Sequence, residues 1–88
     1  MIVGANRAFT HEGREYHIQA EDLGEEAGCF EVRVYEHGAV LWNKRVPYAD
    51  VLDRGLPRPA QEDTLREMMQ KTLHTVQAAI VKGKLARE

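Results

Sequence analysis

Four histidines raise the question of a metal site. His11 and His17 lie on either side of a predicted two-residue turn, which points their side chains to opposite faces of a hairpin. His37 lies in a second predicted turn, and His74 lies on a predicted helix. No two of them have the helical spacing of four residues, or the close placement on one strand face, that directs two imidazoles to one ion. We therefore expect no metal site and no cofactor.

An acidic segment and a single cysteine are the other residues with chemical potential. Glu21, Asp22, Glu25 and Glu26 carry the oxygen ligands that Ca²⁺ prefers, but the segment lacks the ligand spacing of an EF-hand loop. Cys29 is the only cysteine, so no intramolecular disulfide forms, and its place at the start of a strand is typical of a small apolar residue. Glycine-rich phosphate loops and Gly-x-Ser-x-Gly elbows are both missing from the sequence. We expect a protein that is not an enzyme.

The clearest pattern in the sequence is a hairpin over residues 30–46. Residues 30–35 alternate strictly between apolar and polar, and His37-Gly38 is typical of a turn. With a two-residue turn, Arg33 lies opposite Trp42 and Tyr35 lies opposite Val40. One face then carries Phe30, Val32, Val34, Ala39 and Leu41, and the other carries Glu31, Arg33, Tyr35, Val40, Trp42, Lys44 and Val46.

The second of these faces is the predicted interaction surface. If one helix covers the opposite face, Tyr35, Val40 and Trp42 point away from it, with Arg33 and Lys44 beside them. Contiguous apolar area rimmed by charge is typical of binding surfaces, and large aromatic anchors dominate protein–protein affinity. The same residue types suit stacking on the bases of a single strand. In the alternative interpretation, the N-terminal segment or a short helix covers this face and Trp42 belongs to the core.

The remaining elements complete an α+β fold in a single domain over residues 1–88. A first hairpin turns at Glu12-Gly13 and places Phe9 opposite Tyr16. The predicted order is an N-terminal segment (1–6, left open as a further strand), a four-stranded antiparallel meander (7–46), a short helix (48–54), a proline-rich connector (55–60) and a long amphipathic helix (61–83).

We expect the long helix to carry more apolar surface than a small sheet can cover. Its apolar stripe comprises Leu65, Met68, Met69, Leu73, Val76, Ala79, Ile80 and Gly83. About twenty-two helical residues span roughly 33 Å, against about 15–20 Å for the sheet. The stretch around Val76, Ala79 and Ile80 therefore needs a further cover. That cover is either the short helix, Leu56 or the N-terminal Ile2-Val3, or else a second subunit or a partner.

Composition limits the partners. The chain has 88 residues, with 12 basic and 14 acidic side chains and a formal net charge of −2, which disfavours a general polyanion-binding role. The first six residues are too short and polar for a secretory signal, and no apolar run is long enough to span a membrane. We expect a cytoplasmic protein with no membrane contact and no small-molecule ligand.

Two functions remain. The first is a non-catalytic protein-interaction or regulatory module, whose partner is another protein or a second copy in a homodimer. The alternative is a single-stranded nucleic-acid-binding protein that uses the aromatic and basic sheet face. The order of four strands followed by a helix resembles that of small dimeric coactivators that bind single strands, although no motif of such a family is present in the sequence.

Overall fold

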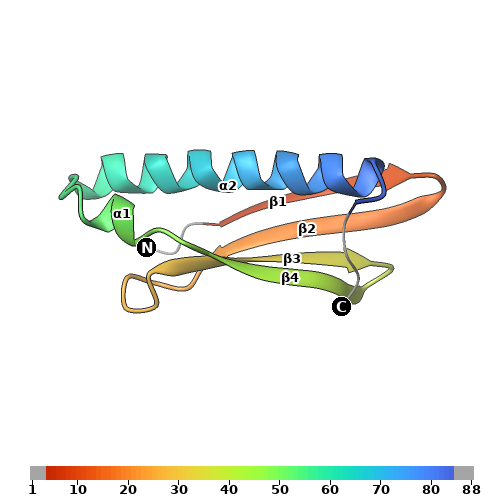
Figure 1. The fold of residues 1–88 in the computed structure, drawn as a ribbon, viewed down its shortest axis with the longest axis horizontal. Coiled ribbons are helices and arrows are strands. Elements are labelled where there is room, and N and C mark those ends of the chain that lie inside the picture. Colours follow the sequence, from red (N-terminus) through yellow and green to blue (C-terminus); the bar gives the residue numbers. More distant parts are fainter. Residues whose placement is uncertain (1–3, 85–88) are drawn as a thin grey trace.

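The computed structural model describes residues 4–84 and shows one antiparallel sheet with a long helix along one of its faces (Figure 1). The strands follow one another as neighbours in the order β1-β2-β3-β4, which confirms the predicted α+β meander. Gly4–Asn6, predicted to precede the sheet, belong to its first strand, and residues 1–3 lie outside the described part. The elements are β1 (Gly4–His11), β2 (Arg14–Asp22), β3 (Cys29–Glu36), β4 (Ala39–Pro47), α1 (Ala49–Leu52) and α2 (Arg58–Val81).

The first hairpin has the predicted register. Glu12 and Gly13 have φ values of 52° and 77°, as a two-residue turn of the primed type requires at both of its central positions. Phe9 therefore lies opposite Tyr16. Their rings stack with centroids 5.3 Å apart on the face that packs against α2.

The second hairpin contains a β-bulge, and the side chains of β4 that follow it lie on the opposite face of the sheet from the one predicted. Its turn is also of two residues, and Tyr35 lies opposite Val40 as predicted. The register then shifts: Trp42 lies opposite Val34, and Arg33 lies opposite Asn43. The predicted pairing of Arg33 with Trp42 is therefore wrong. One extra residue in β4, Leu41, moves every following side chain to the other face, because side chains alternate with a period of two.

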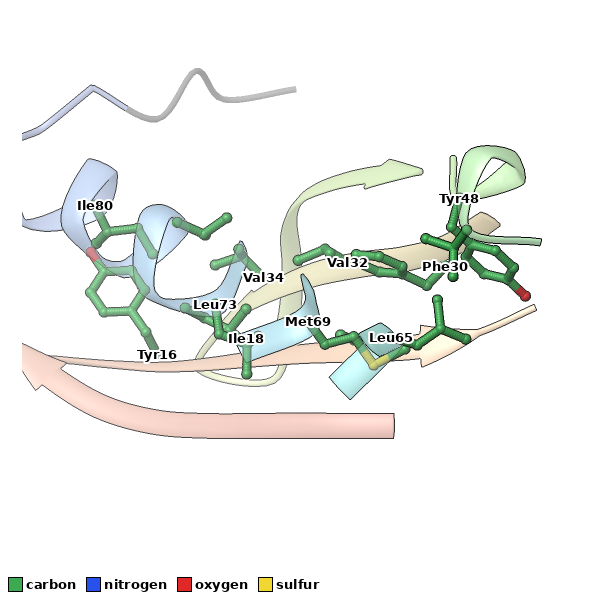
Figure 2. Packing of buried hydrophobic residues seen from close by; sticks show 13 residues of the cluster. Tyr16, Ile18, Phe30, Val32, Val34, Tyr48, Leu65, Met69, Leu73 and Ile80 are labelled. Carbon is green, nitrogen blue, oxygen red and sulfur yellow. The ribbon is translucent and has the colours of Figure 1, made fainter. Parts of the chain in front are cut away.

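The core lies between the sheet and α2 (Figure 2). Ile18 from β2 and Val32 and Val34 from β3 contribute fully buried side chains. From α2 the buried side chains are Leu65, Met69, Leu73, Val76 and Ile80.

The expectation that the sheet is too short to cover Val76 and Ile80 is wrong. These side chains are only 6% and 8% exposed. The strands have eight or nine residues, about 26–31 Å, and run lengthwise beside the 24-residue helix of about 36 Å (Figure 1). The sheet itself therefore covers almost the whole apolar stripe.

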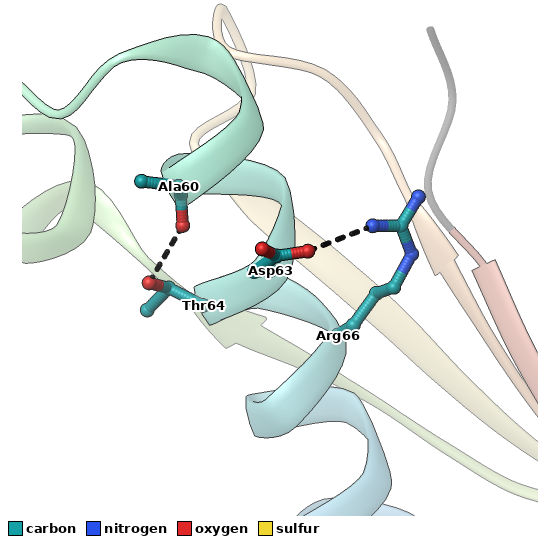
Figure 3. A network of polar contacts seen from close by, with 4 residues as sticks. All are labelled: Ala60, Asp63, Thr64 and Arg66. Atoms are coloured by element: carbon teal, nitrogen blue, oxygen red, sulfur yellow. Dashed lines mark hydrogen bonds and ion pairs between the residues drawn. The ribbon is translucent and has the colours of Figure 1, made fainter.

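α2 begins three residues before its predicted start. Pro57 is its N-cap residue, and Pro59 falls in the first turn, where the missing proline N–H costs no hydrogen bond. Asp63 consequently lies in the second turn, where its carboxylate forms an exposed ion pair with Arg66 at 3.3 Å (Figure 3). The Thr64 hydroxyl donates to the carbonyl of Ala60 one turn earlier. The segment predicted as a connector over 55–60 is thus helical from Arg58.

Tyr48 anchors the corner between the sheet and the helices. Its side chain is fully buried, its N–H donates to the carbonyl of Gly28, and its hydroxyl donates to a carboxylate oxygen of Asp22. The Gly24 N–H donates to the same oxygen at 2.9 Å. One phenol therefore ties the segment after β4 to the loop between β2 and β3.

We expect the stability of the domain to fall above about pH 10 because of Tyr48. Burial of the ring, followed by the hydrogen bond to Asp22, raises the pKa of Tyr48 above its ordinary value of 10.0. The unfolded chain then releases this proton at a lower pH than the folded chain, so the stabilising contribution is complete below pH 10 and is lost as the pH rises further. Urea unfolding midpoints measured from about pH 8 to pH 11 should decline less steeply for Tyr48→Phe than for the wild type. Parallel declines would show that Tyr48 is not the group responsible.

Candidate interaction face of the sheet

One face of the sheet carries no helix within residues 4–84 (Figure 1). The meander register aligns its side chains in rows that run across the strands. The amide row comprises Asn6, Gln19, Arg33 and Asn43. The aromatic row comprises Ala8, His17, Tyr35 and Val40. All eight side chains are exposed or partly exposed, and they form the central part of this helix-free side of the sheet, which is called the open face.

The aromatic row is the most apolar part of the open face. Val40 is 55% exposed, the largest exposure among the large hydrophobic residues of the described chain. The rings of His17 and Tyr35, from the two central strands, lie with centroids 6.4 Å apart and tilted by 44°. Beside them the surface is hollowed into a shallow depression, whose lining includes Ala8, Glu15, His17, Tyr35 and His37. The row can therefore receive an apolar or aromatic side chain from a partner.

Arg33 lies between the aromatic row and the charged residues Glu21, Glu31 and Arg45 at one end of the open face. The Tyr35 hydroxyl, and then the Glu31 carboxylate at 2.6 Å from the guanidinium, raise the pKa of Arg33 above its ordinary value. A guanidinium paired with a carboxylate has fewer conformations to lose when it binds. Arg33 is thus positioned as a polar contact in the row next to the aromatic row.

The predicted site residues divide between two sides of the sheet. Arg33, Tyr35 and Val40 lie together on the open face, whereas the bulge places Trp42 and Lys44 on the side of α2, opposite Val34 and Val32. Trp42 is partly buried and packs against the core. It is therefore not part of an outward aromatic patch, and the two α2 residues of the prediction, Val76 and Ile80, are buried as described above.

Two residues of the aromatic row were not among the predicted site residues. Ala8 and His17 belong to the first hairpin, and the turn at Glu12-Gly13 already implied that they share a face. Their alignment with Tyr35 depends on the register between β2 and β3. An irregular loop connects these two strands, so the register between them cannot be predicted from a short turn in the sequence.

Other candidate chemistry does not gather at this face. Cys29 is a free thiol but is buried, and within residues 4–84 no three His, Cys, Asp or Glu side chains lie close enough together to hold a metal ion. The described helices also include none with the length and apolar character needed to cross a membrane.

Comparison of the chain with protein-family models, curated proteins and solved structures gives no match.

Proposed function

We propose that this protein is a non-catalytic interaction module that binds a partner protein through the open face. The observation that carries the proposal is the aromatic row, which crosses all four strands and leaves Tyr35 and Val40 accessible beside a depression. Tyrosine and arginine are enriched among residues that dominate protein–protein affinity, and Arg33 lies in the adjacent row. An apolar strip between polar rows also has the arrangement of an interface core with a hydrated rim.

The charges of the open face favour a protein over a polyanion. Glu15, Glu21 and Glu31 share this face with Arg33 and Arg45, so carboxylates outnumber guanidinium groups. Binding to phosphates draws its affinity from excess positive charge. A partner surface with its own mixed charges fits this pattern better.

The depression favours recognition over catalysis. It is open to solvent along the sheet, whereas general acid–base chemistry depends on groups held in a desolvated site at hydrogen-bond distance from the substrate. We therefore assign Tyr35 and Arg33 a binding role only.

Affinity capture from the native host tests the proposal. Tagged wild-type protein should recover at least one protein, and Tyr35→Ala should lower its recovery by about tenfold or more, as loss of an aromatic anchor does. His74→Ala is the matched control, because His74 is exposed on α2. If every recovered protein is retained equally by Tyr35→Ala, the open face is not the binding surface.

A single-stranded nucleic acid is the second candidate ligand. The observation in its favour is the pair of adjacent rings of His17 and Tyr35 on the central strands, with Arg33 beside them. Aromatic side chains on such a sheet can stack with successive bases. Fluorescence anisotropy of labelled mixed-sequence oligonucleotides at low salt is a suitable assay, because Trp42 lies on the other side of the sheet and would not report this contact. Salt-sensitive binding that Tyr35→Ala abolishes would favour this function over the protein partner.

A further inference from the structure

The two edges of the sheet differ in how well they are protected against pairing with another strand. The edge strand β4 contains the bulge at Leu41, the adjacent cations Lys44 and Arg45, and Pro47 at its end. Bulges, lysines and prolines are the usual means by which proteins block an exposed edge. β1 has no bulge in its pairing with β2 and no proline, and within residues 4–84 no other strand pairs with it.

Arg7 is the only Asp, Glu, Lys or Arg residue within β1, and its side chain is already engaged. The Arg7 guanidinium donates to the side-chain oxygen of Gln77 at 3.1 Å and to that of Gln70 at 3.4 Å. These contacts hold it over α2, on the side of the sheet away from the open face. Three of the other side chains of β1 are small or absent, at Gly4, Ala5 and Ala8, so the backbone of this edge is accessible.

The hairpin geometry determines which backbone groups of β1 point outward. In a hairpin with a two-residue turn, the residues that flank the turn, His11 and Arg14, exchange hydrogen bonds. Every second residue back along β1 therefore also bonds to β2, and the residues between them do not. The Glu15 carbonyl accepts from the His37 N–H and so points away from β1, which agrees with this alternation. The N–H and C=O groups that face the free edge belong to Gly4, Asn6, Ala8 and Thr10.

We propose that β1 pairs with β1 of a second copy of this chain, antiparallel, with Ala8 opposite the partner's Ala8. An antiparallel strand pair is compatible with two-fold symmetry, which most small homo-oligomers have. In this register Asn6 lies opposite the partner's Thr10. The backbone groups of Asn6, Ala8 and Thr10 that point outward therefore each meet outward-pointing groups of the partner. Arg7 lies opposite the partner's Phe9, a cation beside an aromatic ring.

Electrostatics selects this register over the neighbouring one. Two opposite residues must point to the same face of the sheet, so both have even numbers or both have odd numbers. Neighbouring registers therefore differ by two in the sum of the paired residue numbers, which is 16 for the proposed register. The next register in one direction places Arg7 opposite the partner's Arg7, and like charges directly opposite each other are destabilising. The next register in the other direction places Phe9 opposite the partner's Phe9 and shortens the paired part of β1 from residues 5–11 to residues 7–11.

The dimer would double the open face. The two-fold axis passes through the sheet at Ala8, so both open faces lie on the same side of one eight-stranded sheet. Because Ala8 belongs to the aromatic row, the two rows join end to end, from Val40 of one copy to the partner's Val40. Dimer formation itself does not depend on the open face binding a partner protein.

Light scattering with size-exclusion chromatography over a dilution series tests the dimer. The wild type should pass from the monomer mass of 10.0 kDa towards twice that value as concentration rises. Ala8→Lys should remain monomeric, because it opposes two cations at the two-fold axis. Asn43→Lys, on the open face at the opposite edge, should dimerise like the wild type. A wild type that stays monomeric up to about 1 mM, or a dimer that only Asn43→Lys abolishes, would overturn the proposal.

Cross-linking tests the register separately. A hydrogen-bonded antiparallel pair has a Cα–Cα distance of about 5.5 Å, within the range that a disulfide bridges. In a Cys29→Ala background, Ala8→Cys should give a disulfide-linked dimer under mild oxidation, and Arg7→Cys should not. Efficient cross-linking of Arg7→Cys with little for Ala8→Cys would contradict the proposed register.

Discussion

Ile18→Asp is expected to abolish cooperative folding. Ile18 is fully buried between β2 and α2, so the substitution places an unpaired carboxylate in the core and removes apolar contacts. Such changes cost more than about 4 kcal/mol, which approaches the whole stability of a small domain. Circular dichroism during urea titration should show no cooperative transition at 25 °C.

The matched control is Gln19→Asp, one residue further along the same strand. Gln19 lies on the open face opposite Arg33, so the new carboxylate is hydrated and faces a guanidinium. We expect its unfolding midpoint to stay within the range of surface substitutions, about 0.5 kcal/mol from the wild type. A cooperative transition for Ile18→Asp that matches that of Gln19→Asp would show that β2 does not have the faces described.

Trp42→Ala is expected to lower the free energy of unfolding by about 2–3 kcal/mol. Complete burial of an indole gives losses of about 3–5 kcal/mol on truncation, and Trp42 is only partly buried. The loss arises because the bulge at Leu41 turns Trp42 towards α2, where it packs against the core opposite Val34. Equilibrium urea unfolding, fitted with a common slope, measures the difference.

Tyr35→Ala provides the comparison for the Trp42 result. Tyr35 is an aromatic residue on the neighbouring strand but lies on the open face, so its truncation should cost about 1 kcal/mol or less. The reverse order, with Tyr35→Ala more damaging than Trp42→Ala, would mean that β4 continues without a bulge and that Trp42 faces outward.

The bulge shows why β4 was misjudged from the sequence. Residues 39–42 read Ala-Val-Leu-Trp, four apolar residues in succession, so no polar side chain marks which one is the extra residue. In the first hairpin, by contrast, Thr10, Glu15 and His17 identify the hydrated face, and the predicted register is correct. A binary pattern can locate an inserted residue only where alternation is visible on both sides of it.

The prediction that the sheet is too short to cover Val76 and Ile80 on α2 failed for a reason of geometry. The periodicity of Leu65, Met69 and Leu73 correctly identified the buried stripe. The error lay in setting a typical strand length against the helix, because β1 and β2 have eight and nine residues and run beside α2 rather than across it (Figure 1). The angle between the strands and the helix axis depends on how their side chains interlock in three dimensions. It therefore cannot be predicted from the sequence of either element alone.

The candidate site was accessible from the sequence only in part. Arg33, Tyr35 and Val40 were assigned to one face correctly because all three precede the bulge at Leu41 along the chain, so the extra residue does not change their faces. The contribution of His17 depends on how β2 and β3 align across the loop that contains Leu23 and Gly28. Two hydrogen bonds inside that loop, from Leu23 to Cys29 and from Gly28 to Gly24, define its closure, and they have no short sequence signature.

The most direct test of the open face uses the histidines as reporters. His17 lies in the aromatic row and lines the depression, whereas His74 is exposed on α2. Diethylpyrocarbonate modification, quantified by mass spectrometry, should be measured on purified protein and on the same protein in native host extract. We predict that modification of His17 falls in the extract while that of His74 is unchanged. Equal modification of His17 under both conditions, or protection of His74 alone, would contradict the assignment of the open face as the binding surface.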